Sequence, residues 1–211
     1  VLSFKVPKTA ESKNLDFSAG ARFLLKKQVV IFLVAAFLML VSHGTYYGFF
    51  SIHLENLGFS STFIGVAWAL AVLAEIGIMI YSRPIFQRFS HERVLMAAFA
   101  LATVRWLVLA RAEAAWLILA TQLLHAFSYG AFHVASILYI DALTPAAAKT
   151  LGQAVNNAVT YGLGIMIGFF VNGIFFEIIG AGALFAGSGV LAALGGALLV
   201  FETATRKKTA D

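Results

Sequence analysis

The sequence predicts an all-α membrane protein, a bundle of six transmembrane helices with both chain ends in the cytoplasm. Three observations lead to this prediction: an apolar composition, six hydrophobic segments of membrane-spanning length, and a one-sided distribution of basic residues. Of the 211 residues, 61% are hydrophobic and 12% are charged, whereas soluble domains have about 45–50% and about 25%. Since one small core cannot bury so much apolar surface, we expect a lipid bilayer around the bundle.

The composition also excludes several classes of site. The chain contains no cysteine, which excludes a disulfide scaffold and thiolate metal sites. Its formal net charge is +5. In a membrane protein such an excess usually reflects Lys and Arg retained on the cytoplasmic side. We therefore expect no nucleic-acid partner, and no cofactor.

Polar stretches flank the apolar part of the chain. Residues 1–27 lack the short apolar region and the small-residue cleavage site of a signal peptide. We expect this stretch to be a cytoplasmic linker, and Val1 to be an internal position of a longer chain. Residues 202–211 are expected to form a cytoplasmic tail.

Six apolar segments lie between these stretches, each near the roughly 20 residues needed to cross about 30 Å of hydrocarbon. Their apolar character is continuous and does not alternate, which favours helices over barrel strands. The short turn 111–114 separates the third segment from the fourth, and glycines within 176–183 break the fifth from the sixth. The expected spans are 28–50, 62–82, 94–111, 114–140, 151–178 and 181–201.

The orientation of the bundle follows from its basic residues. If the N-terminus is cytoplasmic, then 13 of the 15 Lys and Arg residues lie on the cytoplasmic side. Arg111 alone lies outside, and Arg105 falls within the third segment. Cytoplasmic loops of membrane proteins carry such an excess of Lys and Arg, so the asymmetry favours six spans with both termini inside.

Polar side chains occur near the end of the first segment, in LVSHGTYYGFF. His43 and Tyr47 are four residues apart, and so are Tyr46 and Phe50, so they share a broad helix face. Tyrosines are common in the aromatic belts at membrane surfaces. His43 lies a turn or two deeper than a belt requires, so we favour a cavity-lining role for this face.

Glu75 lies in the middle of the second segment, in LAVLAEIGIMI, with no basic residue nearby in the sequence. An isolated ionised carboxylate is costly to bury, so we expect Glu75 to be protonated or paired. A protonatable carboxyl at this depth suits proton coupling, and a structural hydrogen bond to a neighbouring helix is the alternative.

The fourth segment contains a polar stripe. At 100° per residue its polar side chains fall within an arc of about 80° of the helix, and the opposite side is apolar. The two histidines are eight residues apart, too distant for one metal ion, so we expect no zinc site. We favour a substrate or proton path over structural bonding between helices. The stripe comprises Gln122, His125, Tyr129, His133 and Ser136.

Two further segments carry polar groups. In the fifth, Gln153, Asn157 and Tyr161 follow one another at four-residue spacing. These residues are equally compatible with contact to a neighbouring helix and with contact to a substrate. Arg105, next to Trp106 in the third segment, has three possible roles: snorkelling outward, reaching Glu75, or holding an anionic substrate. Snorkelling is the safest assumption.

Two alternatives to a carrier fit the sequence less well. Six helices and a serine flanked by glycines, Ser188 in AGSG, are features of intramembrane proteases, but no histidine follows Ser188 to act as its base. A homo-oligomeric channel would show a filter segment or a ring-forming charge. The polar groups are instead spread over several helices, which favours a site within one bundle.

Four motifs occur in order along the chain: SHGTYYGFFSIHLENLGFS at Ser42–Ser60, AEI at Ala74–Ile76, HAFSYGAFHVASI at His125–Ile137 and QAVNN at Gln153–Asn157. This pattern resembles the C-terminal half of major facilitator superfamily transporters. Within the superfamily it is most similar to the phenylpropionate permease family, which is related to proton-linked sugar and nucleoside symporters. The resemblance covers about residues 28–201.

The resemblance implies helices seven to twelve of a twelve-helix protein, with residues 1–27 as its central linker. The 83–93 stretch stands where the superfamily has a basic loop between helices eight and nine, but it lacks the usual glycine and aspartate. The substrate cavity of the superfamily lies between two halves. The chain would therefore be a fragment, be completed by another chain, or dimerise with itself.

The function predicted is a secondary transporter of the inner membrane, with a site near the bilayer midplane that takes protons and a small solute. Glu75 would carry the proton, with His43 and His125 as secondary candidates. The resemblance suggests a small organic anion such as an aromatic carboxylate. The residues expected on the substrate side are Tyr47, Arg105, Gln122, His125, Tyr129, His133, Asn157 and Tyr161.

Overall fold

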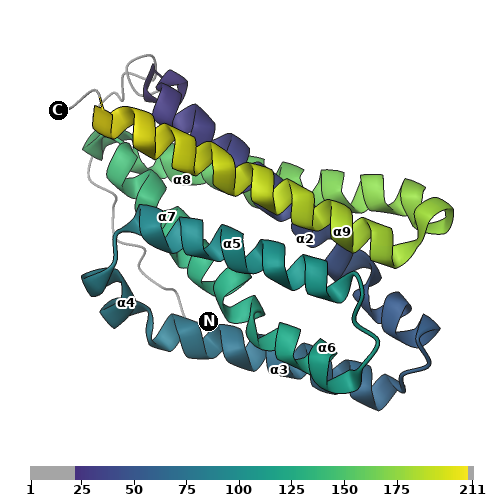
Figure 1. Ribbon diagram of the computed structural model, residues 1–211. Helices are drawn as coiled ribbons and strands as arrows, with labels where there is room; N and C mark the ends of the chain where they lie inside the picture. Colours follow the sequence, from purple (N-terminus) through teal and green to yellow (C-terminus); the bar gives the residue numbers. More distant parts are fainter. Residues whose placement is uncertain (1–21, 209–211) are drawn as a thin grey trace, which may run out of the picture.

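The computed structural model describes residues 22–208, and helices connected by short turns make up this range (Figure 1). No strand occurs between residues 22 and 208. Most of the expected linker 1–27, and residues 209–211 of the expected tail, lie outside the described residues. The described end of the linker forms a short 3-10 helix, η1 (Phe23–Leu25), and the tail continues as helix to Lys208.

The first part of the chain forms α2 (Lys27–Asn56), α3 (Ser61–Ile80), α4 (Ser82–Arg88) and α5 (His91–Leu109). The Ser60 and Ser90 hydroxyls cap α3 and α5 by accepting backbone N–H groups of those helices. The expectation of a loop over 83–93 is wrong in part, since α4 occupies its first half. Pro84 lies in the first turn of α4, where a missing N–H costs nothing.

The second part of the chain forms two longer helical stretches. The first consists of α6 (Ala115–Leu123), a π-helix η2 (Ala126–Ala131) and α7 (Phe132–Leu143). After η3 (Ala146–Ala148), the second consists of α8 (Lys149–Asn157), a π-helix η4 (Ala158–Gly164) and α9 (Ile165–Lys208). Since π-helical turns are wider than α-helical ones, both stretches depart locally from the 3.6-residue period.

Helix α9 is two antiparallel arms, because Gly180 has φ 76° and ψ 165°. This backbone conformation is open to glycine and strained for other residues. The chain reverses there, and the two arms run side by side (Figure 1). We call 165–179 the first arm and 181–208 the second arm.

Helix α2 packs closely against both arms. A Cβ atom on Gly44 would lie 2.6 Å from the backbone of Gly168 in the first arm, so the absence of a side chain permits the contact. The Thr45 hydroxyl lies 2.9 Å from Asn172 Oδ1 in the first arm and 2.7 Å from Ser188 Oγ in the second arm. These small and polar residues hold α2 between the arms.

Four helical stretches in residues 22–208 are long and apolar enough to cross a membrane: Lys27–Asn56, Ser61–Ile80, Ala115–Leu143 and Ala146–Lys208. The last includes the reversal at Gly180, and α5 is not among the four. Stretches of this length and composition indicate a multi-pass membrane protein.

The start of α2, the start of α5 and the end of α9 lie at the same end of the bundle (Figure 1). Arg206 of α9 pairs with Glu92 of α5 at this end, and Gln28 of α2 donates to the Tyr139 hydroxyl of α7 at 3.0 Å. Lys26, Arg206 and the adjoining basic residues therefore gather at one end.

Candidate functional site

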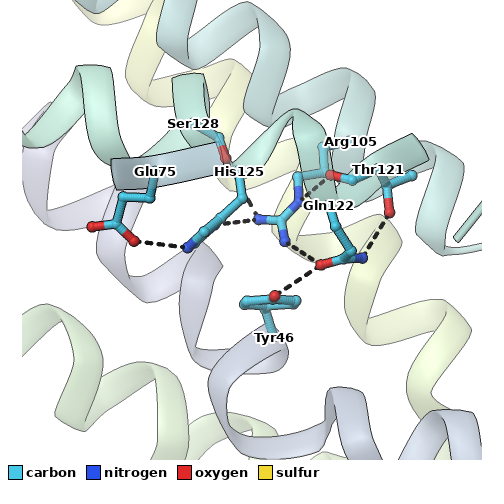
Figure 2. Close-up of polar contacts among 7 residues, drawn as sticks. All are labelled: Tyr46, Glu75, Arg105, Thr121, Gln122, His125 and Ser128. Carbon is cyan, nitrogen blue, oxygen red and sulfur yellow. Dashed lines mark hydrogen bonds and ion pairs between the residues drawn. The ribbon is translucent and has the colours of Figure 1, made fainter. Parts of the chain in front are cut away.

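A network of polar side chains lies inside the bundle, with Arg105 of α5 at its centre (Figure 2). Arg105 is 0% exposed. Its Nε donates to the Thr121 carbonyl at 3.0 Å, and its Nη2 donates to Gln122 Oε1 at 3.3 Å. The guanidinium carbon also lies 4.1 Å from the centroid of the Tyr46 ring, a cation–π distance. The expectation that Arg105 snorkels outward is therefore wrong, because its charge is satisfied inside the protein.

Gln122 links helix α2 to helix α5. Its Oε1 accepts a hydrogen bond from the Tyr46 hydroxyl at 2.8 Å in addition to the one from Arg105 (Figure 2). Its Nε2 donates to the Ile118 carbonyl and to the Thr121 hydroxyl. With both ends of the amide occupied, the Gln122 side chain has a single orientation.

His125 stands between Arg105 and Glu75. Arg105 Nη1 lies 3.0 Å from His125 Nδ1, and a guanidinium has donors only. Nδ1 must therefore accept this bond, so the proton of a neutral His125 ring is on Nε2. That nitrogen lies 3.6 Å from Glu75 Oε2 of α3 (Figure 2), just beyond hydrogen-bond length.

Helix α3 approaches the π-helix η2 closely at Glu75. A Cβ atom on Gly130 would lie 2.6 Å from Ile78 Cγ2 and 3.1 Å from Glu75 Cγ. A larger residue at this position would displace the Ile78 side chain. The Glu75 side chain is 19% exposed, whereas that of His125 is 3% exposed, so the carboxyl lies at the boundary between the buried network and the surface.

A stack of three rings continues from His125 along η2 into α7. The Tyr129 ring stacks on His125 with centroids 5.2 Å apart, and on His133 with centroids 6.4 Å apart. His133 Nδ1 lies 2.6 Å from the Tyr161 hydroxyl of η4. The Tyr47 ring of α2 meets Tyr129 edge-on at 5.7 Å. Aromatic side chains from three helical stretches thus meet here.

The structure also places His43 in this group. Its ring centroid lies 5.6 Å from that of Tyr129 and 4.9 Å from that of Trp106. His43 is 0% exposed and its Nδ1 bonds the Met39 carbonyl at 2.8 Å, whereas its Nε2 has no partner among the described residues. An interfacial aromatic belt does not fit a histidine buried this deeply.

One side of the group is accessible. Tyr47, Tyr129, His133 and Tyr161 are partly exposed, and Asn157 is exposed. The site thus consists of a buried polar base and a more open aromatic rim. We use "polar base" for Tyr46, Arg105, Gln122 and His125, and "aromatic rim" for Tyr47, Tyr129, His133 and Tyr161.

Some of the polar residues found in the sequence lie elsewhere. Ser136 donates to Asn156 Oδ1 at 3.3 Å, and Gln153 donates to the Ile137 carbonyl at 2.9 Å. These bonds tie α7 to α8 and leave Ser136 outside the site. Thr121 and Ser128 both contact Arg105 and were not expected from the sequence. The position of Ser128 three residues after His125 is the signal that could have found it.

No group of three His, Asp or Glu side chains within residues 22–208 is placed to hold a metal ion. The groups available in the site are proton donors and acceptors, one fixed positive charge and aromatic rings. Such a set can hold a proton on a carboxyl or on an imidazole, and it can bind an anion or an aromatic ring.

Comparison with known proteins gives several matches. The chain is 30% identical over 176 residues to "Probable 3-phenylpropionic acid transporter" of Escherichia coli (strain K12), which is 83% of this chain and 46% of that protein. It is 24% identical over 202 residues to "Uncharacterized transporter YwbF" of Bacillus subtilis (strain 168), which is 95% of this chain and 51% of that protein. It is 27% identical over 183 residues to "Maltose permease" of Geobacillus stearothermophilus, which is 85% of this chain and 45% of that protein.

The chain thus spans about half the length of these relatives. All three are named as transporters or permeases, which argues against the intramembrane enzyme. The sequence model of a family described as "MFS_1 like family" matches residues 5–186. The resemblance to the major facilitator superfamily is confirmed, and the chain belongs to the MFS_1 like family.

Proposed function

We propose that the chain is the C-terminal half of a secondary transporter in the inner membrane, with both termini cytoplasmic. The six spans would be α2, α3, α5, the stretch α6–η2–α7, the stretch from α8 to the first arm of α9, and the second arm. Two observations support this count: the chain reverses at Gly180, and the charge of Arg105 in α5 is buried. The gathering of basic residues at one end supports the orientation.

Proton coupling through Glu75 is the central part of the proposal. The observation that carries it is the distance of 3.6 Å between Glu75 Oε2 and His125 Nε2, next to Arg105. If the two side chains moved slightly closer, an ionised Glu75 would accept a hydrogen bond from the His125 N–H. A protonated Glu75 would lose that attraction and turn toward the open side. Its protonation state would thereby change the contact between α3 and η2, and His43 and His125 remain the secondary candidates for carrying the proton.

A small organic solute such as an aromatic carboxylate is the proposed substrate. The aromatic rim offers ring faces and edges against which an aromatic group can pack, and His133 and the Tyr161 hydroxyl offer polar partners. Asn157 is exposed one helical turn before Tyr161. The similarity to the protein named "Probable 3-phenylpropionic acid transporter" supports the same class of solute. Arg105 would act on the site indirectly, through its hydrogen bonds to Gln122 and His125.

The other wall of the proposed cavity would come from an N-terminal six-helix half or from a second copy of this chain. A channel is less well supported. The polar base and Glu75 come from α2, α3, α5 and the α6–η2 region of a single bundle, whereas a pore through an oligomer repeats one position around an axis.

The experiment is uptake of radiolabelled 3-phenylpropionate by proteoliposomes that contain the complete transporter, this chain together with its N-terminal half. We expect accumulation above the external concentration under an inward proton gradient, and its loss when a protonophore is added. Uptake that only equilibrates, with or without the gradient, would contradict proton coupling. No uptake of any aromatic carboxylate would contradict the substrate class.

A further inference from the structure

A hollow lies on a different part of the bundle from the candidate site. It is a groove of about 420 Å³ between α4, the start of α5 and η2, within the roughly 300–1,000 Å³ typical of ligand pockets. Ile85, Phe89, Ala97 and Phe127 are among its lining residues, and Arg93 is its only charged one. We call it the α4–α5 groove.

The α4–α5 groove faces away from the candidate site. Phe127 and Ala131 line the groove, whereas Tyr129 and His133 belong to the aromatic rim. These two pairs alternate at two-residue steps, which places them on opposite sides of the helical stretch. Phe127 is 41% exposed and Phe89 is 46% exposed. In a membrane protein, an exposed apolar surface on the outer side of the bundle contacts lipid.

Positive charge lies at only one end of the groove. Arg93 is in the first turn of α5 and exposed, and no hydrogen bond or ion pair of its guanidinium is found within residues 22–208. The Arg88 guanidinium lies 5.8 Å from the centroid of the Phe89 ring, so a second cation stands beside the same end. The groove therefore has apolar walls and positive charge at one end.

We propose that the α4–α5 groove binds an anionic phospholipid, with the upper part of an acyl chain against Ile85, Ala97 and Phe127 and the phosphate at Arg93. Basic pockets between helices at the cytoplasmic face suit such headgroups. The lining on α5 runs from residue 93 to residue 98. This is about 8 Å of helix, so the groove would hold the part of the chain nearest to the headgroup. The occupant is a lipid and not the transported solute, because the groove opens on the side opposite to the aromatic rim.

The test is a lipid titration of the complete transporter in detergent, followed by native mass spectrometry. The probes are phosphatidylglycerol and phosphatidylcholine with identical acyl chains. We expect phosphatidylglycerol to bind more tightly, and Arg93→Gln to weaken its binding about fivefold, the effect of one basic residue near the surface. The binding of phosphatidylcholine should change little in Arg93→Gln. Arg111→Gln is the matched control: it removes the same charge from an exposed residue at the opposite end of α5, and it should leave both lipids unaffected.

A second variant tests the apolar part of the groove. Ala97 is exposed, so Ala97→Trp should fold and fill the space for the acyl chain, and it should weaken the binding of both lipids. Arg93 is also exposed, so Arg93→Gln tests the proposal even if the tryptophan variant fails to fold. Equal binding of the two lipids by the wild type, or equal behaviour of Arg93→Gln and Arg111→Gln, would overturn the proposal. Unchanged lipid binding by a folded Ala97→Trp would overturn it as well. None of these measurements depends on transport.

Discussion

His125 separates the buried Arg105 from Glu75: its Nδ1 lies 3.0 Å from Arg105 Nη1 and its Nε2 lies 3.6 Å from Glu75 Oε2. Since the guanidinium can only donate, it determines which imidazole nitrogen carries the proton of the neutral ring. A residue that has no contact with the open side of the site can therefore control what His125 offers to the carboxyl. Arg105 is in this sense a positioning residue.

The first prediction concerns the buried charge of Arg105. Arg105→Gln removes the donors to the Thr121 carbonyl and to His125, so it should destabilise the protein by about 1.5–3 kcal/mol, the usual worth of a hydrogen bond to a charged group. Arg105→Lys should not restore stability, because an ammonium lacks the planar fork of donors. The melting temperature in detergent measures the effect, with Arg111→Gln as the exposed control. Equal melting of Arg105→Gln and the wild type would show that the network contributes little.

A second prediction concerns the aromatic rim. Tyr161→Phe keeps the ring but removes the hydroxyl that bonds His133 Nδ1 at 2.6 Å. If the proposed substrate contacts this pair, KM for 3-phenylpropionate should rise about two- to tenfold, the range for one hydrogen bond, while proton coupling persists. Tyr81→Phe is the matched control, since Tyr81 is 68% exposed at the end of α3. An unchanged KM in Tyr161→Phe would place the substrate elsewhere.

The third prediction tests the close contact of α2 with α9. Gly44→Ala places a methyl group 2.6 Å from the Gly168 backbone, so the two helices must separate. The cost should be about 1–3 kcal/mol, as for other overpacked cores, and should appear as a lower melting temperature. The control Gly187→Ala, where no atom lies within 4 Å of the added Cβ, should melt at or above the wild-type temperature. If both variants melt alike, the backbones are not in close contact.

The fourth prediction assigns Ser188 a structural role. Its hydroxyl lies 2.7 Å from Thr45 Oγ1 in a buried position, and such bonds between transmembrane helices average about 0.6 kcal/mol. Ser188→Ala should therefore lower the melting temperature slightly and leave transport intact. Loss of uptake in a variant that melts like the wild type would instead make Ser188 a functional group.

The sequence alone was sufficient for the all-helical membrane class, because that class depends on composition and on continuous apolar runs. The stretch of glycines at 176–183 predicted a break, and the chain reverses at Gly180 within it. Helix α4 was not foreseen, since SRPIFQR is polar and begins near a proline. The two π-helices were not foreseen either, because no residue pattern distinguishes them from α-helix.

The site was only partly predictable for the same reason. The stripe drawn with a constant 100° per residue kept His125, Tyr129 and His133 together, and they do stack. It also included Ser136, which bonds α8 instead. The main wrong prediction was that Arg105 snorkels outward. Its hydrogen-bond partners, the Thr121 carbonyl among them, come from other helical stretches. The residues next to Arg105 in the sequence therefore do not indicate that it is buried.

The most direct test of the account compares two transport modes in Glu75→Gln, with Glu177→Gln as the control at an exposed carboxyl. Glutamine resembles the protonated acid but cannot release a proton. Proton-driven uptake of 3-phenylpropionate should therefore be lost in Glu75→Gln, while exchange of internal for external substrate, which needs no net proton movement, should persist. The control should retain both modes. Accumulation driven by the proton gradient at the wild-type level in Glu75→Gln would contradict the role given to Glu75 and to its contact with His125.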